Sequence, residues 1–470
     1  MNIKRILTVC LAIVCLALHG HAEAKYIFYF IGDGMGSNQI LAAEMYQAEL
    51  EGKIGRNALQ MSSLPYSGNA VNFSSSNAIT CSAAAGTALA TGHKTNANYI
   101  GVDKDGNAVE SVAEKLKKNG WSVGIMTSVS IDHATPACFY AHEMSRNSYY
   151  TIGEALAESN FDFFGGASFL QPTDKKNHKQ PNLYDLCESK GYTFARGRND
   201  AQQKMNAQKL IMIPANEGLD KTQGSHTQLP FAINRTANDL KLSDITETAI
   251  QFLQAKNNNF FMMIEGGNID WACHNNDAAC AVREVIDMDE SVRLAYQFYL
   301  AHPDETLIVV TADHETGGMS LGVSDYTLKL SNLESQHISS NLLSDTLKNL
   351  HKHYSKKLKW QQVKQVLEDE TGLYSAIDVT MEEDVKLQGM FRTMMKHRNE
   401  KQIKNLYNSL GQLSATAIAM VDKKAKIGWT THGHSALVVP VFAVGVGAEQ
   451  FTGWQDNTEI MPKILHAAGL

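Results

Sequence analysis

Five short apolar runs, three of them preceded by a stretch with helical spacing, constrain the fold of this chain more than any other feature. The helical patterns at residues 108–118, 244–255 and 282–301 each lead directly into one of these runs. A helix followed closely by a buried strand, three times over, predicts an α/β fold with a central, mostly parallel sheet and helices on both faces. The predicted strands are residues 26–31, 122–126, 260–264, 307–311 and 437–444.

One region departs from this alternation. Residues of about 325–425 are rich in Leu, Lys, Glu, Gln and Asn, and they lie within a proline-free stretch, residues 304–439. We predict a mainly helical insertion there. Residues 25–470 then form one large α/β domain that includes this insertion, rather than several domains.

The first 24 residues have the order of a secretory signal peptide. Lys4 and Arg5 precede an apolar stretch, residues 6–18, and then Ala22-Glu23-Ala24. The apolar stretch is too short for a comfortable membrane span, so we predict cleavage after Ala24 and an exported protein, periplasmic or secreted, without a stable membrane anchor.

The remaining chain is acidic. Removing Lys4, Arg5 and Glu23 from 42 basic and 49 acidic residues leaves 40 and 48, a formal charge of −8. This charge, without a basic run, argues against nucleic acid as the main partner. Five cysteines remain, an odd number, so at least one is unpaired within a monomer.

Acidic residues and a histidine follow the ends of three predicted strands. Asp33 follows residues 26–31, Glu265 follows 260–264, and Asp313-His314 follow 307–311. Side chains just beyond the carboxyl ends of strands in an open α/β sheet converge on one edge, where ligands bind. We therefore expect these side chains to meet.

Carboxylates gathered at one edge repel each other, and divalent cations would relieve that repulsion. Asp270 and His274 are four residues apart, so on a helix they share a face and could bind one ion, with His434 as a third ligand. Three protein ligands and an open position are typical of a catalytic zinc. Taken singly, each residue has an ordinary alternative role in a turn, a helix cap or the solvated surface. The carboxylates are Asp33, Glu265, Asp270 and Asp313.

The stretch TCSAAAGTALATG, residues 80–92, admits two interpretations. Ser82 or Thr80 could cap a helix of small residues that begins near Ala83. Alternatively, the free amides and the positive end of that helix could stabilise an anion at the Ser82 oxygen or a phosphate beside it. The local sequence leaves both open.

Six motifs in a fixed order make the chain resemble the alkaline phosphatases over nearly all of residues 25–470. The resemblance implies the fold of that family, hydrolysis of phosphate monoesters through a phosphoserine intermediate, release of inorganic phosphate and an alcohol, and a homodimer. The motifs are GDGMG, CSAAAGTALATG, HATPACFYAHEMSR, EGGNIDWACH, TADHETGG and THGHSALVVPVFAVG.

The resemblance also implies roles for single residues. Ser82 is similar to the family's nucleophile, with its alkoxide stabilised by a zinc ion, and Arg146 to its bidentate phosphate clamp, a task that suits a planar guanidinium. The implied ligands are Asp270, His274 and His434 for one zinc ion, Asp33, Asp313 and His314 for a second, and Asp33, Thr135 and Glu265 for a third site, usually magnesium.

Three positions depart from the best-known members of the family. Cys81 stands where an aspartate often helps to hold the arginine. His133 and Trp271 stand where the best-known bacterial enzyme has an acid and a lysine, and they resemble marine-bacterial and animal variants. We expect His133 to lie around the third metal site and to affect its metal preference. Trp271 could stack on an aromatic leaving group or simply pack in the interior.

Two other functions compete with an exported phosphomonoesterase. A phosphodiesterase or sulfatase of the same superfamily is disfavoured by the third site implied at Thr135 and Glu265. A zinc- or phosphate-binding protein without turnover is encouraged only by Cys81.

Overall fold

The computed structural model describes residues 23–470 except 176–178, 220–226, 324, 397–401 and 405–408. The predicted signal peptide therefore lies outside the described residues, apart from Glu23 and Ala24. Ala24 is buried, and its N–H donates to the Ala467 carbonyl at 2.7 Å, a bond that cleavage after Ala24 would remove. Within the described part of the chain, no helix has the length and apolarity needed to cross a membrane.

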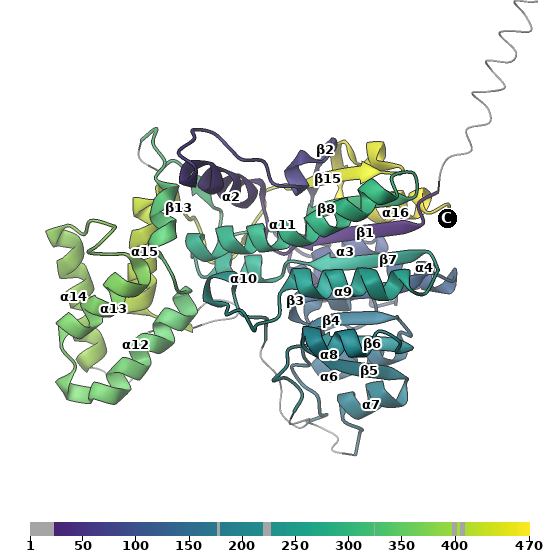
Figure 1. The fold of residues 1–470 in the computed structure, drawn as a ribbon, viewed down its shortest axis with the longest axis horizontal. Coiled ribbons are helices and arrows are strands. Elements are labelled where there is room, and N and C mark those ends of the chain that lie inside the picture. Colours follow the sequence, from purple (N-terminus) through teal and green to yellow (C-terminus); the bar gives the residue numbers. More distant parts are fainter. Residues whose placement is uncertain (1–22, 176–178, 220–226, 324, 397–401, 405–408) are drawn as a thin grey trace, which may run out of the picture.

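A ten-stranded sheet forms the centre of the described structure (Figure 1). All its strand pairs are parallel except those of β15, which runs antiparallel to both of its neighbours. This confirms the predicted α/β fold with a mostly parallel sheet. In spatial order the strands are β16 (Gly453–Asp456), β2 (Tyr66–Val71), β15 (Val439–Gly445), β8 (Thr306–Ala312), β1 (Tyr26–Gly32), β7 (Phe260–Glu265), β3 (Ser122–Ser130), β4 (Phe163–Ala167), β6 (Lys209–Ile213) and β5 (Tyr192–Arg196).

Helices cover both faces of the sheet, which explains why its central strands consist mostly of apolar residues. In Figure 1, α9 (Leu242–Gln254) and α11 (Ala278–Ala301) cross the near face, while α3 (Ser82–Thr91) and α4 (Val112–Lys118) lie behind it. Every residue of β3, β7 and β8 is buried. Burial from both sides favours an unbroken apolar strand over an alternating one.

The helix predicted over residues 108–118 starts later than expected, at Val112. Ser111 Oγ accepts from the Glu114 N–H at 3.1 Å, and the Glu114 carboxylate accepts from the Ser111 N–H at 2.8 Å. This reciprocal cap fixes the start of the helix. Residues 108–110 precede it, and Ala108 forms an isolated bridge with Val102.

Four helices lie to one side of the sheet, at the left of Figure 1, in the region that we expected to be mainly helical. Two short strands, β11 (Gln402–Lys404) and β12 (Ser409–Gly411), accompany them. The helices are α12 (Ser340–Tyr354), α13 (Trp360–Thr371), α14 (Met381–Lys396) and α15 (Gln412–Lys424). The five cysteines of the described chain, from Cys81 to Cys280, are all free thiols.

Candidate active site

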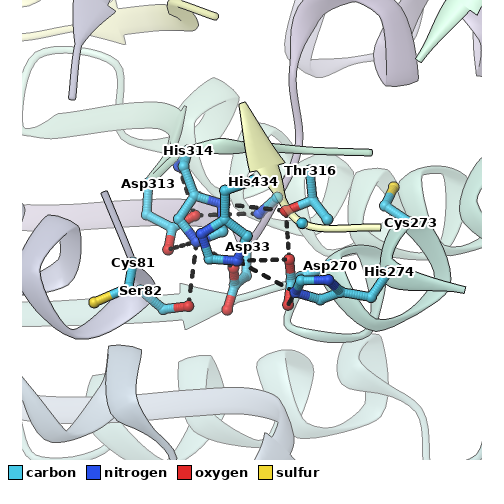
Figure 2. A network of polar contacts seen from close by, with 12 residues as sticks. Asp33, Cys81, Ser82, Asp270, Cys273, His274, Asp313, His314, Thr316 and His434 are labelled. Carbon is cyan, nitrogen blue, oxygen red and sulfur yellow. Dashed lines mark hydrogen bonds and ion pairs between the residues drawn. The ribbon is translucent and has the colours of Figure 1, made fainter. Parts of the chain in front are cut away.

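The carboxyl ends of the central strands bring the predicted polar side chains together. Asp33 follows β1, Glu265 ends β7, and Asp313 follows β8. Helix α10 (Asn268–His274) follows β7 and carries Asp270 and His274. Figure 2 shows these side chains, apart from Glu265, pointing toward one another.

His434 reaches the same edge by a different route. It precedes β15 instead of following it, but β15 is antiparallel to β8, so its amino end lies at the carboxyl ends of the other strands. His434 and Ser435 also pair with Thr316 and Glu315 in a short two-stranded ladder. This pairing holds the histidine beside the residues that follow β8.

Three groups of side chains have ligand atoms close enough together to hold a metal ion, each within 4.8 Å of one another. Asp33 and His314 each belong to two groups, so the groups form one continuous cluster. They are Asp270 with His314 and His434, Asp33 with Asp313 and His314, and Asp33 with His133 and Glu265.

Two histidines lie differently from their expected places. His274 is beside the first group rather than in it, with Nε2 3.3 Å from Asp270 Oδ2 and 3.2 Å from His434 Nε2. His133, which we expected around the third site, contributes a ring nitrogen to the third group itself. The rings of His314 and His434 stack with centroids 3.6 Å apart.

Six buried oxygen atoms around this cluster have no well-directed hydrogen bond among the described residues, although three of them lie 3.2–3.4 Å from an imidazole nitrogen. A buried polar atom without a partner costs free energy, so such a concentration needs an explanation. Carboxylate and hydroxyl oxygens beside imidazoles are the donor set of zinc and magnesium sites, so the residues present fit these ions. The atoms are both carboxylate oxygens of Asp33, Oδ2 of Asp270 and Asp313, Oε1 of Glu265, and Oγ1 of Thr135.

The carboxylates disfavour one another's ionisation. Burial, and then the charges of Asp313 and Asp270, raise the pKa of Asp33 well above its ordinary value. Burial raises the pKa of Glu265 to about 7, and burial with the Asp270 charge raises that of Asp313 to about 8. For Asp270, burial acts in the same direction, but the adjacent imidazoles, His274 foremost, hold the pKa below its ordinary value. A bound cation would relieve this repulsion.

Ser82 is the first residue of α3, and its hydroxyl does not cap the helix. Cys81 occupies the cap position without a side-chain hydrogen bond, and the Thr80 hydroxyl donates to the Cys81 carbonyl at 3.3 Å. The cap interpretation is therefore wrong for both hydroxyls. Ser82 is fully buried, and its Oγ lies 3.2 Å from His314 Nε2, at the edge of the cluster (Figure 2).

Arg146 approaches the cluster from the side of His133. Its Nη2 donates to His133 Nε2 at 3.0 Å, and only 7% of its surface is exposed. Burial and the Arg146 charge lower the pKa of His133 to about 3, so the imidazole stays neutral at ordinary pH. Trp271 is buried and meets His133 edge-on, with ring centroids 6.0 Å apart. The Cys81 sulfur accepts from the Asn98 N–H at 3.2 Å.

Sequence reasoning missed the groups that orient these side chains. The Thr127 hydroxyl donates to Glu265, and Thr316 Oγ1 donates to Asp270 Oδ1 at 2.5 Å. His274 Nδ1 lies 2.5 Å from the carbonyl oxygen of His432. Thr316 and His432 stand within the quoted motifs, whereas Thr127 could be found only from the pairing of β3 with β7.

A buried serine at the start of a helix, beside a cluster suited to divalent cations at the carboxyl edge of an α/β sheet, defines a metal-dependent hydrolase. The family model for alkaline phosphatase matches residues 24–470. The chain therefore belongs to the alkaline phosphatase family, and it hydrolyses phosphate monoesters.

Relatives and solved structures agree with this assignment. Alkaline phosphatase 4 of Bacillus subtilis (strain 168) is 32% identical, over 94% of this chain and 89% of its own length. Alkaline phosphatase 3 of the same organism is 30% identical, over 95% of this chain and 89% of its own length. The crystal structure of a cold-active alkaline phosphatase from a psychrophile, Shewanella sp., has a TM-score of 0.77 at 27% identity, covering 94% of this chain and 99% of that one.

Proposed function

We propose that Ser82 is the nucleophile of a two-step phosphomonoester hydrolysis. Ser82 Oγ loses its proton and bonds to phosphorus while the bond from phosphorus to the ester oxygen breaks, and the leaving alkoxide takes up a proton to give the alcohol. Water then cleaves the bond between phosphorus and Ser82 Oγ, which restores the hydroxyl and releases inorganic phosphate. Two displacements give net retention at phosphorus. The observation that carries the proposal is the position of Ser82 Oγ, buried at the first residue of α3 and 3.2 Å from His314 Nε2. The amides at this helix end favour negative charge on the serine oxygen and on the transferred group.

Arg146 is the proposed phosphate clamp. A guanidinium presents several N–H donors in one plane and can bind two phosphoryl oxygens at once. The neutral His133 ring accepts from Nη2 and so holds the guanidinium next to the cluster. Catalysis of phosphoryl transfer consists mostly of positioning the substrate and stabilising the negative charge distributed over the phosphoryl oxygens. A guanidinium held at this place could do both.

The cluster is the proposed site of two zinc ions and one magnesium ion. When bound, these cations would supply the positive charge that stabilises the attacking and leaving oxygens. His133 has a ring nitrogen in the third group, but a neutral imidazole has a single acceptor nitrogen, so His133 would have to give up its bond from Arg146 to bind an ion. In that arrangement nitrogen would favour zinc over magnesium. Metal analysis of the purified protein tests the assignment. The proposed ligands are Asp270, His274 and His434, then Asp33, Asp313 and His314, then Asp33, Thr135 and Glu265 with His133 beside them.

Steady-state hydrolysis of an aryl phosphate monoester at alkaline pH tests the nucleophile. We expect Ser82→Ala to lose nearly all activity and to yield no acid-stable phosphoprotein after quenching, while the control Ser189→Ala, at an exposed serine whose hydroxyl bonds within its own helix, behaves like wild type. A methyl aryl phosphate should be a poor substrate. An active Ser82→Ala variant would refute the role of Ser82.

Export, cleavage after Ala24 and a homodimer remain proposals. N-terminal sequencing of protein recovered outside the cytoplasm tests the first two. Light scattering of the purified enzyme tests the third.

A further inference from the structure

A short segment, residues 98–101, links the helix that carries Ser82 to the residue that we propose as phosphate clamp. Ser82 begins α3, whereas Arg146 belongs to a separate stretch of chain. The distance between these two residues therefore depends on the contacts that connect the two stretches. We propose that Thr87 of α3, acting through the 98–101 segment, is a positioning residue for Arg146. This inference rests on the phosphate-binding role proposed above for Arg146.

Thr87 holds the segment with a single hydroxyl. The side chain is fully buried in the middle of α3. Its Oγ1 accepts from the Gly101 N–H at 3.0 Å and donates to the Tyr99 carbonyl at 3.2 Å. Two backbone groups of the segment are thus attached to the helix five residues after Ser82.

The segment in turn holds the chain around Arg146. Ile100 and Glu143 exchange two backbone hydrogen bonds, at 2.7 and 2.8 Å, and the Arg146 N–H donates to the Asn98 carbonyl at 2.9 Å. The approach is close, because a Cβ added at Gly101, where φ is +55°, would lie 2.1 Å from the Ala141 carbonyl oxygen. A displacement of the segment would therefore be passed to the backbone of Arg146.

A second and weaker link runs through Cys81, whose sulfur accepts from the Asn98 N–H at 3.2 Å. A thiol is a poor hydrogen-bond acceptor. The Thr87 hydroxyl makes two hydrogen bonds to the segment, whereas the Cys81 thiol makes one, so the route from Thr87 carries more of the positioning.

Thr87→Val is the sharpest test, because valine has the shape of threonine without its hydroxyl. It leaves the Gly101 N–H and the Tyr99 carbonyl without their partner on α3. We expect kcat/KM and the inhibition by inorganic phosphate to weaken by roughly ten- to a hundredfold, since a displacement of about 1 Å can cost that much. Thr87→Ser keeps the hydroxyl and should remain close to wild type. If Thr87→Ser and Thr87→Val lowered kcat/KM and phosphate inhibition by the same factor, the proposal would be overturned.

A double-mutant cycle separates positioning from a general structural effect. If Thr87 acts through Arg146, Thr87→Val should cause little further loss in an Arg146→Ala background, because coupled residues are not additive. If Thr87→Val lowered kcat/KM by the same factor in wild type and in Arg146→Ala, the proposal would be overturned. Phosphate inhibition unchanged in Arg146→Ala alone would instead refute the clamp role, so the two failures are distinguishable.

A second pair of variants covers the case in which Thr87→Val fails to fold. Asn98 has φ +71°, a left-handed conformation that glycine adopts freely and alanine does not. Asn98→Gly should keep phosphate inhibition near wild type, and Asn98→Ala should weaken it. Equal phosphate inhibition constants for the two variants would contradict the inference.

Discussion

Removal of divalent cations should lower the melting temperature by about 8 °C. The substitution Asp33→Asn should lower the melting temperature of the metal-loaded enzyme but raise that of the chelated enzyme. The structure contains three groups able to hold an ion. An ion that binds only the folded state, at a free concentration of about 100 times its Kd, contributes about 2.7 kcal/mol, so three contribute about 8 kcal/mol. An unfolding entropy of about 2.1 cal/mol/K per residue gives about 1 kcal/mol per degree for 470 residues.

Asp33 is the informative residue because it belongs to two of the three groups. In the loaded enzyme, Asp33→Asn should weaken the binding of up to two ions. The same arithmetic gives a fall in melting temperature of as much as about 5 °C. In the chelated enzyme it should raise the melting temperature, because the amide removes one of four buried carboxylates that oppose each other's ionisation.

Differential scanning calorimetry of wild type, Asp33→Asn and the exposed control Asp105→Asn, each with added Zn²⁺ and Mg²⁺ and then with chelator, measures both shifts. We expect Asp105→Asn to have little effect in either condition. A similar fall in melting temperature for Asp33→Asn in both conditions would refute the reasoning, because the carboxylate would then stabilise the fold without any cation.

Two further predictions concern charge. Arg146→Lys should weaken inhibition by inorganic phosphate by roughly 10- to 100-fold, since a hydrogen bond to a charged group contributes about 1.5–3 kcal/mol and lysine cannot reproduce the planar fork; an unchanged inhibition constant would count against a bidentate clamp. Glu284 is buried, and burial, followed by the Asp287 charge, raises its pKa from 4.5 to about 8. Its contribution to stability is therefore complete below about pH 4.5 and is lost as the pH rises through 8. The free energy of unfolding, measured in urea at pH 5 and pH 8.5, should become more favourable to Glu284→Gln relative to wild type at the higher pH. A difference between variant and wild type that is the same at both pH values would contradict this.

The edge at which the site forms could be predicted from sequence, because strand order did not have to be known. Any parallel sheet brings Asp33, Glu265 and Asp313 to one edge, whichever strands are neighbours. For His434 the sequence indicates only a possible third ligand of one ion, together with the resemblance to the family. The physical reason for its place is the antiparallel direction of β15, which places the residue before that strand beside residues that follow the others.

The groups that orient the ligands could not be predicted in this way. Thr127 meets Glu265 because β3 and β7 pair in a particular register, with these two residues opposite each other. The placement of His133 within the third group likewise depends on the turn that follows β3. Register and turn geometry come from packing across the whole sheet, so neither can be obtained from the residues themselves.

The start of α3 shows how small a difference decides the role of a side chain. A helix that began one residue later would make Ser82 the cap residue, and its hydroxyl would then accept from amides within the same helix. Because Cys81 is at the cap position, Ser82 belongs to the first turn and its hydroxyl lies beside His314. Helix ends predicted from sequence are uncertain by more than one residue. The sequence of this helix start alone therefore does not separate a capping serine from the nucleophile that we propose. The proposal depends on the cluster beside the hydroxyl, which the fold assembles from residues as distant as His434.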